Sequence, residues 1–205
     1  MSRQIVLATQ NKGKIAEFER LLAEFASDIQ VLGLADFPDL PDVEETGSTF
    51  LENALLKSRE VSAFTNLPAI SDDSGLCIDF LNGDPGIFSA RWSGVHGDDV
   101  ANIEKVLRQL EGVEDPHRTA HFTCSVALSF PPHHPLHGQD ISREGILPGK
   151  ITAAPRGSAG FGYDPIFQPD GFDLTLGEFA HGQKDQISHR GQALRAIAPE
   201  ITRLI

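Results

Sequence analysis

The first part of the chain alternates between the two hydrophobic periodicities that define an α/β protein. Residues 4–9 (QIVLAT) form a short apolar run of the length expected for a buried strand. After a polar turn, four apolar residues recur at helical spacing and predict a helix over residues 15–25. Residues 29–34 then form a second candidate strand. This order favours an open α/β sheet, in which ligands bind in the crevice beyond the strand ends.

The polar turn before this helix is a candidate anion site. Thr9, Asn11 and Lys14 would lie at the helix start, where free backbone N–H groups and the helix dipole favour an anion. The spacing is neither that of the Gly-rich dinucleotide fingerprint nor that of the P-loop. Asn11 and Gly13 could equally do no more than form the turn. The candidate residues are Thr9, Gln10, Asn11, Lys12, Gly13 and Lys14.

A second helix, predicted to end near Phe64, carries two residues that can act together. Thr49 is followed three residues later by Glu52, which is the capping-box pattern of a helix start. Asn53 and Lys57 are four residues apart, so they share a helix face and can reach one ligand. The expected apolar side consists of Phe50, Ala54, Val61 and Phe64.

Two neighbouring acids, Asp72 and Asp73, are the centre of the candidate site. They follow the apolar residues 67–70 and precede Ser74–Gly75, so we expect them at a strand end beside a tight turn, facing a cleft. A further strand is expected over residues 76–80. Acids in loops are usually solvated, so the pair by itself gives only weak support for a metal or catalytic role.

A second pair of acids, Glu44 and Glu45, directly precedes the second helix. Negative charge at a helix N-terminus usually complements the helix dipole. When residue types alone are considered, that ordinary role is the simpler interpretation of this pair.

The middle of the chain predicts a helix over residues 98–110 and a β-hairpin formed by residues 120–128 and 141–147. Alternating apolar and polar residues in the first hairpin strand indicate that one of its faces is exposed. The intervening residues 130–140 contain three histidines, which suggest a metal site. Because no Cys, Asp or Glu stands at ligand spacing and prolines interrupt the segment, a flexible exposed loop is the favoured interpretation.

The sequence APRGSAGFGYDPIFQ is a Gly- and Pro-rich segment that suits a shaped binding loop. Gly160 and Gly162 allow the backbone to approach a ligand closely. Phe161 and Tyr163 could stack on a planar base, and Asp164 could accept hydrogen bonds from its ring N–H groups. Equally, the two aromatic side chains could fill the core.

A C-terminal helix is predicted to begin near Ser188, a candidate cap, with His189 and Arg190 in its first turn. Cations at a helix start oppose the dipole. An anionic or carbonyl-bearing ligand would explain their position.

Composition narrows the functional classes. The chain has 205 residues, enough for one domain or one two-lobed domain. Its net charge of −12 argues against binding to polymeric nucleic acid, which depends on many Lys and Arg contacts to phosphate. A small anionic ligand needs only a local group of cations, often bridged by a metal.

The cysteines and the lengths of the apolar runs indicate the cellular compartment of the protein. Cys77 and Cys124 are flanked by apolar residues, so we expect buried free thiols and a reducing compartment. The first apolar run is too short for a signal peptide, and no run approaches the length of a membrane span. We therefore expect a cytoplasmic protein with no membrane partner.

Five segments together resemble the Ham1 family of non-canonical purine nucleoside triphosphate pyrophosphatases. Their order and spacing match over nearly the whole chain, and the joint occurrence of DDSG, GFGYDP and SHR is very specific. The chain departs from the family pattern in residues 130–140, which are longer and richer in His, and at Asp185, where Asn is commoner. The segments are LATQNKGKIAEF, EETGSTFLENALLKS, SDDSGLCIDFLNGDPGIFSARWSG, PRGSAGFGYDPIF and KDQISHRGQAL.

The resemblance implies a fold and an activity. The fold is a single two-lobed ITPase-like domain over residues 1–205, of the α/β kind also described as anticodon-binding or Maf-like, with a long twisted mixed sheet, a central cleft and usually a homodimer. The activity is Mg²⁺-dependent hydrolysis of a purine nucleoside triphosphate (ITP, dITP or XTP) to the monophosphate and pyrophosphate. A Maf-like pyrophosphatase for modified pyrimidine nucleotides and a non-catalytic nucleotide sensor are the alternatives.

The resemblance also implies roles for particular residues. Asp73 would accept the proton, and Ser74 would contact the substrate. The acids that would hold Mg²⁺ are Glu44, Glu45, Asp72 and Asp73. The triphosphate would be held by Thr9, Gln10, Asn11, Lys12, Gly13, Lys14, Asn53 and Lys57. The base pocket would be formed by Phe161, Gly162, Tyr163, Asp164, Lys184, His189 and Arg190.

Overall fold

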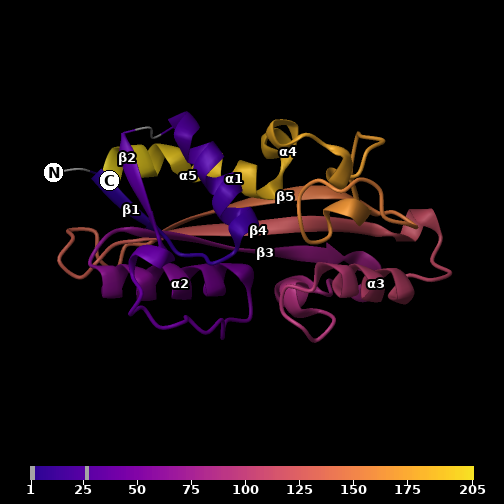
Figure 1. The fold of residues 1–205 in the computed structure, drawn as a ribbon, viewed down its shortest axis with the longest axis horizontal. Coiled ribbons are helices and arrows are strands. Elements are labelled where there is room, and N and C mark those ends of the chain that lie inside the picture. The colour runs from indigo at the N-terminus through magenta and orange to yellow at the C-terminus, as the bar shows by residue number, and fades with distance from the viewer. Residues whose placement is uncertain (1–2, 26–27) are drawn as a thin grey trace. The chain divides into compact units, whose positions relative to one another are not determined.

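The computed structural model describes residues 3–25 and 28–205 and has the mixed α/β architecture that the sequence predicted (Figure 1). The strands of this described part form one sheet in the order β2-β1-β3-β4-β5-β6. They are β1 (Arg3–Leu7), β2 (Ile29–Gly33), β3 (Ala69–Ile78), β4 (Thr119–Ser129), β5 (Ile141–Ile151) and β6 (Phe167–Pro169). β1 pairs in parallel with β2 and β3, whereas β5 and β6 pair antiparallel, so the sheet is mixed.

The described α-helices follow the predicted order with small shifts of their ends, except that α4 was not predicted. They are α1 (Lys12–Phe25), α2 (Phe50–Thr65), α3 (Asp99–Gln109), α4 (His181–Ile187) and α5 (His189–Leu204). Thr49 caps α2 as predicted by accepting a hydrogen bond from the Glu52 N–H at 3.1 Å. The Glu52 carboxylate, however, accepts from the N–H of Ser48, one residue before the cap, at 2.7 Å. None of the described helices combines the length and the apolar character needed to cross a bilayer.

The chain divides into two compact units, each with its own core. Unit 1 comprises Met1–Asp73, Cys124–Gly145 and Arg190–Ile205, and unit 2 comprises Ser74–Thr123 and Ile146–His189. Strands β3, β4 and β5 each contribute residues to both units. The central cleft and the single two-lobed domain expected from the family resemblance stay predictions.

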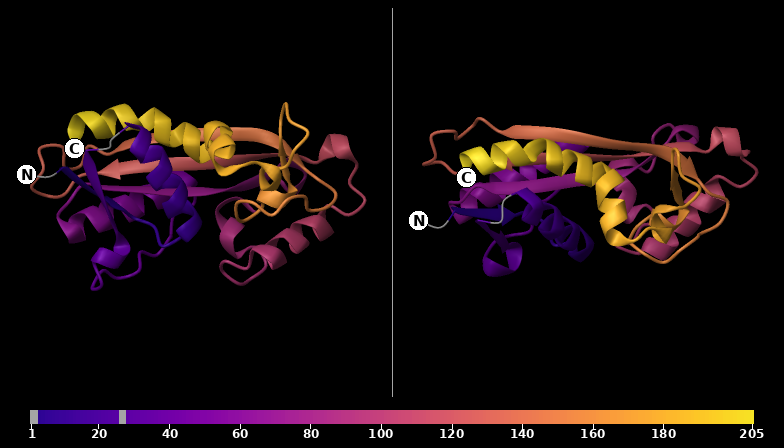
Figure 2. Two further views of the ribbon diagram at one scale, coloured as in Figure 1. Left: turned by 45° about the horizontal axis from the view of Figure 1, so that its top comes forward. Right: turned by 90° about the horizontal axis from the view of Figure 1, so that it is seen from above.

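Unit 1 has three layers because its strands are buried on both faces. Successive side chains of a strand point to opposite faces of the sheet. Ile5 and Leu7 of β1 pack with α1 and α5, whereas Val6 packs with Val61 of α2. Figure 1 shows α1 and α5 on one face of the sheet and α2 on the other, and Figure 2 shows α1 beside α5. Ile15, Phe18 and Leu22 of α1 lie in or against this core, and the side chain of Phe25 is outside the described part.

Three sequence predictions about exposure were wrong. Phe64, assigned to the apolar side of α2, is 49% exposed, and Val100, assigned to the inner side of α3, is 69% exposed. β4 was expected to have an exposed face, but its unit 1 residues Cys124–Ser129 are all buried. Helices cover both faces of the sheet in unit 1 (Figure 1), so the polar residues of β4 are buried there too. The sequence alone does not reveal which polar side chains of a strand have partners inside the protein.

The hairpin loop of residues 130–140 makes more contacts than its composition predicted. His134 stacks on the buried ring of Phe130 at a centroid distance of 4.6 Å, and His137 Nδ1 lies 3.1 Å from the Phe130 carbonyl oxygen. His133 Nδ1 lies 2.7 Å from Asn66 Oδ1, beyond the end of α2. The loop is largely exposed, as predicted, but these contacts hold it against neighbouring residues of unit 1.

The core of unit 2 forms where α3 packs on the sheet. Ile103, Val106 and Leu110 join Tyr163 and Phe167 in this cluster. The buried guanidinium of Arg118 donates to the carbonyl oxygens of Leu110, Val113, Ile151 and Thr152 at 2.7 to 3.4 Å. One arginine therefore links the carbonyl groups of two segments of unit 2, Leu110–Val113 and Ile151–Thr152.

Candidate functional site

Asp72 and Asp73 lie in the middle of β3, not at its end. The strand runs without interruption from Ala69 to Ile78, so the predicted turn at Ser74–Gly75 was wrong. β1 pairs with β3 only at Ala69 and Ile70, so we attribute the extended conformation of Ser74–Gly75 to pairing with β4, the other neighbour of β3. Both carboxylates are nevertheless buried, with exposed fractions of 2% for Asp72 and 7% for Asp73.

Because the side-chain period of a strand is two residues, the two carboxylates point to opposite faces of the sheet. Ser71 and Asp73 face α2, and Ser71 Oγ donates to the Ala54 carbonyl oxygen at 2.5 Å. Ile70 and Asp72 face α1 and α5. The two neighbouring acids therefore belong to two separate groups of side chains in unit 1.

The first group, the Asp73 cluster, consists of Asp73, Asn53, Lys57 and Glu45. Asn53 Nδ2 donates to Asp73 Oδ2 at 3.0 Å. Lys57 Nζ lies 2.5 Å from Glu45 Oε1 and 3.8 Å from Asp73 Oδ1. The predicted shared face of Asn53 and Lys57 is thus confirmed, since both side chains reach Asp73.

A tight turn before α2 orients Asn53. The N–H of Gly47 donates to Asn53 Oδ1 at 2.8 Å, so the amide oxygen is occupied and the amide nitrogen is directed to Asp73. A Cβ atom at Gly47 would come within 2.7 Å of that same oxygen. Glycine is therefore required here by close packing against the side chain that orders the cluster.

Burial and charge act differently on the groups of the Asp73 cluster. Burial raises the pKa of Asp73, and the negative charge of Glu45 adds to this, whereas Lys57 and Lys14 partly offset it. Burial by itself would lower the pKa of Lys57, but the carboxylates of Asp73 and Glu45 outweigh burial and raise that pKa. The cluster thus combines a charged ammonium group with a carboxylate that binds a proton more readily than an ordinary aspartate.

The Asp73 cluster fits a divalent cation whose coordination shell is completed by water and by the phosphates of a substrate. Among residues 3–25 and 28–205, no group of three or more His, Cys, Asp or Glu side chains is arranged to hold a metal ion. Mg²⁺ usually takes one or two carboxylates together with water and substrate phosphates. Glu45 and Asp73 supply two carboxylates within 4 Å of one ammonium group, whereas Glu44 is exposed and Asp72 faces the other side of the sheet.

The second group, the Asp72 network, consists of Asp72, Lys14, Arg190 and Glu17. Lys14 Nζ lies 3.0 Å and Arg190 Nε 3.2 Å from the same oxygen, Asp72 Oδ2. Arg190 Nη1 also forms an ion pair with Glu17 Oε2. Burial disfavours the charged form of Asp72, but Lys14 and Arg190 outweigh it and hold the pKa of Asp72 well below its usual range.

Sequence reasoning missed Glu17. It is 4% exposed, and it lies three residues after Lys14 and four before the buried Leu21 on α1, which is the spacing of one helix face. An acid on the inner face of an amphipathic helix signals a buried cation partner. Arg190, predicted to contact a base, has Glu17 and Asp72 as partners in unit 1. Its role toward a nucleotide stays a prediction.

In the turn before α1, side-chain oxygens of the turn itself accept hydrogen bonds from its backbone N–H groups. Asn11 Oδ1 accepts a hydrogen bond from the Lys14 N–H at 3.1 Å, and Thr9 Oγ1 accepts from the Asn11 N–H at 3.2 Å. Gln10 donates to Asp42 at 2.7 Å, and Lys12 is exposed. The turn-forming interpretation of Asn11 is confirmed by its contacts, and phosphate binding by this turn stays a prediction.

In unit 2, the residues predicted to bind the base form a cluster of their own. Lys184 Nζ lies 2.7 Å from Asp164 Oδ2 and 4.8 Å from the centre of the Phe161 ring. Asp164 Oδ2 also accepts from the Phe161 N–H at 2.9 Å. Gly160 has a φ of +77°, and a Cβ atom there would come within 1.9 Å of the same carboxylate oxygen. Gly160 thus allows close approach of Asp164 to its own loop.

Other predicted base-pocket residues have structural partners. Tyr163 is 4% exposed, and its hydroxyl donates to the Ser89 carbonyl oxygen at 2.8 Å, so the core-filling alternative describes its packing. Gly162 N–H donates to Asp99 at 2.7 Å. The ring of His189 stacks on Phe122 at a centroid distance of 4.7 Å. Ser74 follows Asp73 in β3 and is partly buried.

Fold and site together define a class: a mixed α/β protein in which buried carboxylates of the central strand β3 pair with lysine and arginine side chains. The model of the Ham1 family matches residues 5–200, and this chain belongs to that family.

Three known proteins illustrate the similarity. A protein of Streptomyces coelicolor named dITP/XTP pyrophosphatase is 48% identical over 202 residues, which cover 98% of both chains. The structure of a HAM1 protein from Coxiella burnetii matches with a TM-score of 0.86 and 43% identity, covering 98% of this chain and 99% of that one. A nucleoside-triphosphatase / dITP/XTP pyrophosphatase structure from Mycobacterium abscessus matches with a TM-score of 0.76 and 43% identity, covering 96% and 99%.

Proposed function

We propose that this chain is a nucleoside triphosphate pyrophosphatase that hydrolyses non-canonical purine nucleotides (dITP, XTP and ITP) to the monophosphate and pyrophosphate. The observation that carries the proposal is the Asp73 cluster, in which a buried carboxylate is fixed by Asn53 beside Lys57 and Glu45. Relatives that match over nearly the full chain and are named dITP/XTP pyrophosphatase support the choice of substrate class.

Asp73 is suited to accept the proton of the attacking water. Its raised pKa makes it a stronger base than an ordinary aspartate, and the amide of Asn53 fixes its orientation. In this proposal water attacks the α-phosphorus and pyrophosphate leaves. Lys57, whose ammonium stays charged, stabilises negative charge on the phosphates.

We propose Mg²⁺ as the cofactor, held by Glu45 and Asp73. When bound, a divalent cation neutralises phosphate charge and lowers the pKa of coordinated water. The chain's own contribution is to hold the two carboxylates close to Lys57, whose Nζ lies 2.5 Å from Glu45 and 3.8 Å from Asp73. Lys14 is proposed to contact the triphosphate after leaving Asp72, which Arg190 continues to neutralise.

Selection of the base is proposed to depend on the carbonyl group at position 6. Inosine and xanthine carry this carbonyl, to which Lys184, His189 or Arg190 can donate, whereas the amino group of adenine would leave the donors unpaired. We expect kcat/KM for ITP to exceed that for ATP by at least about 10²-fold, because an unpaired buried donor is costly. Steady-state kinetics with both nucleotides checks this, and comparable values would contradict the pocket.

A single assay separates the proposed function from its alternatives. Purified protein is incubated with Mg²⁺ and dITP, XTP, ITP, dUTP, dTTP or ATP, and pyrophosphate is distinguished from orthophosphate. Pyrophosphate from dITP and XTP supports the proposal. Activity confined to pyrimidine nucleotides would favour the Maf-like alternative, and binding without any product would favour a nucleotide sensor.

We further propose that the enzyme works in the cytoplasm as a homodimer. Cys77 and Cys124 are free, which suits a reducing compartment. Sedimentation equilibrium of the purified protein measures the oligomeric state, and a mass of one chain at micromolar concentration would contradict the dimer.

A further inference from the structure

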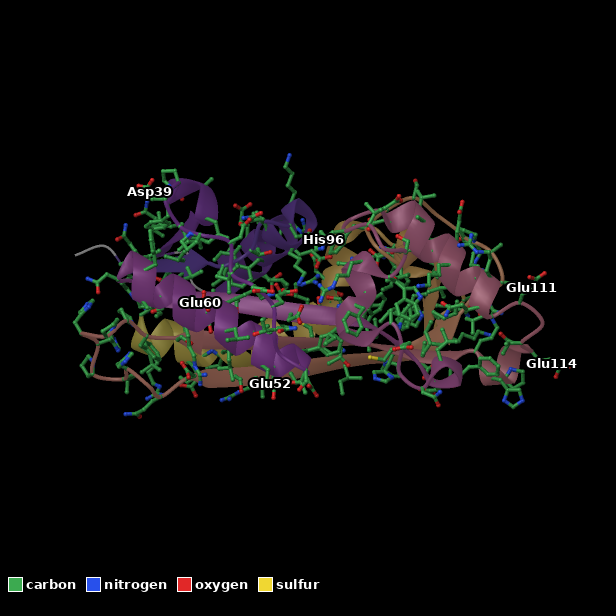
Figure 3. All side chains as sticks on the ribbon, turned by 90° about the horizontal axis from the view of Figure 1, so that it is seen from below. Asp39, Glu52, Glu60, His96, Glu111 and Glu114 are labelled. Carbon is green, nitrogen blue, oxygen red and sulfur yellow. The ribbon has the colours of Figure 1, made fainter. Side chains whose placement is uncertain are left out.

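The buried side of α2 is mostly polar. Its buried residues are Asn53, Ala54, Ser58, Val61 and Ser62, of which three are polar. Glu52 and Glu60 lie on the outer side of the helix (Figure 3). Burial of apolar surface is not directional, so the buried Ala54 and Val61 and the partly buried Phe50, Leu55 and Leu56 hold α2 on the sheet without fixing its axial position. Directional hydrogen bonds are therefore needed to set the position of α2 on the sheet.

A chain of such bonds connects α2 to the hairpin between β4 and β5. Ser58 Oγ lies 2.8 Å from Ser129 Oγ, and Ser129 Oγ donates to Asp140 Oδ1 at 2.6 Å. Arg59 donates to Asp140 Oδ2 from Nε at 2.8 Å and from Nη2 at 2.7 Å. We refer to Ser58, Arg59, Ser129 and Asp140 as the α2 latch.

Asp140 determines the direction of this chain of hydrogen bonds. A carboxylate only accepts, so the single hydroxyl proton of Ser129 is committed to Asp140. The oxygen of Ser129 is then left to accept from Ser58, whose hydroxyl also lies 3.2 Å from the Leu55 carbonyl oxygen of its own helix and is closer to Ser129, at 2.8 Å. Ser58 and Ser129 are at most 1% exposed, and the Asp140 side chain is 11% exposed, so water competes little for these bonds. The loop makes a second attachment just after the end of this helix, where His133 Nδ1 lies 2.7 Å from Asn66 Oδ1.

The α2 latch lies next to the Asp73 cluster along the helix. Ser58 directly follows Lys57, and Asn53 is five residues earlier on the same helix. Hydrogen bonds between successive turns hold a helix together as one rigid element, so an axial shift of α2 at Ser58 moves Lys57 and Asn53 by a similar amount. Catalysis is sensitive to displacements of about 1 Å, which can cost roughly 10²-fold in rate.

We propose that Asp140, acting through Ser129, is a positioning residue that fixes Lys57 and Asn53 against Asp73. The proposal gives a role to the histidine-rich hairpin: it holds the helix that carries two groups of the active site. Its consequence for turnover rests on the proposed pyrophosphatase function, whereas its consequence for the geometry of α2 does not.

The test uses the full-length protein with Asp140→Ala, Ser129→Ala and Asp115→Asn. Asp115→Asn is the control, because Asp115 accepts from Lys150 at 2.7 Å in an exposed ion pair of unit 2. Two readouts do not depend on activity: the ¹H–¹⁵N shift of the Asn53 side-chain amide, assigned by its loss in Asn53→Ala, and hydrogen exchange of the α2 amides. Steady-state kinetics with dITP and Mg²⁺ provides the third.

For Asp140→Ala and Ser129→Ala we expect a displaced Asn53 amide resonance, faster exchange confined to α2, and a fall in kcat of about tenfold or more with a smaller change in KM. The control should match wild type in all three. An unchanged Asn53 resonance with wild-type exchange in α2 would overturn the proposal, as would uniformly faster exchange with unchanged kcat. If wild type does not hydrolyse dITP, the proposed function fails, and the first two readouts still decide whether the latch positions α2.

Discussion

Asp73→Asn will reduce turnover of dITP by at least about 10³-fold while nucleotide binding stays measurable. General-base catalysis contributes typically about 10²–10⁴-fold, and this substitution removes the proposed proton acceptor, which is also a proposed ligand of the cation. The amide oxygen of the new side chain can still accept the hydrogen bond that Asn53 donates at 3.0 Å, so the fold is retained. Single-turnover kinetics and calorimetric titration of the nucleotide measure the two effects separately.

The same variant should be more stable than wild type when no metal is bound. The pKa of Asp73 is raised in the folded protein, so the folded state binds this proton more tightly than the unfolded state does. The charged carboxylate therefore lowers stability once the pH is above the ordinary pKa of aspartate, and stability is regained as the pH falls. Asp73→Asn removes that cost at neutral pH, and thermal unfolding in EDTA should show a higher Tm.

Asp79→Asn is the matched control, because Asp79 is an exposed acid that accepts from Thr119 Oγ1 at 2.7 Å in unit 2. It should leave both turnover and Tm close to wild type. A turnover rate for Asp73→Asn within a few-fold of wild type would remove Asp73 from the proposed chemistry.

Asp72→Asn will lower the free energy of unfolding by about 3–5 kcal/mol, because removing one partner of a buried ion pair leaves uncompensated charge. Lys14 and Arg190 share the same oxygen of Asp72, and Glu17 remains as the acidic partner of Arg190. For a chain of this size we expect Tm to fall by roughly 10 °C. Urea unfolding at neutral pH measures the change in free energy.

The pH dependence identifies the cause of this loss. The pKa of Asp72 is lowered in the folded protein, so its contribution is present above the ordinary pKa of aspartate and is lost as the pH falls toward the lowered value. The difference between wild type and Asp72→Asn should therefore shrink in acid. Asp28→Asn, which removes an exposed ion pair with Arg3, should cost no more than about 1 kcal/mol. An equal loss in both variants would show that burial of the network is not what matters.

The sequence was sufficient for the fold class because its hydrophobic periods change clearly from strand to helix. The spacing of Asn53 and Lys57 also predicted correctly that both reach one point, since neighbours four apart on a helix face the same way. Their target, Asp73, was identified as a candidate from its residue type and its family resemblance. These successes all concern relations within one element or between neighbouring residues.

The sequence failed where a partner lies in a distant segment. Ser74–Gly75 has the composition of a turn, but it lies inside β3, which has β4 as a neighbour in the sheet. Arg190 stands at a helix start, which suggested a ligand, whereas its partners Glu17 and Asp72 come from the opposite end of the chain and from the central strand. Asp140 was grouped with a flexible loop, although it accepts from Arg59 and Ser129.

Side chains of β3 alternate between the two faces of the sheet, so the number of residues in this strand matters as much as their identity. Inserting a single residue between Ile70 and Asp72 would shift the strand by half its repeat and exchange the faces to which the two acids point. Each carboxylate would then meet the helices that serve the other one, with every residue of the site still present in the sequence. Insertions and deletions in this strand should therefore be far less tolerated than substitutions at most of its positions.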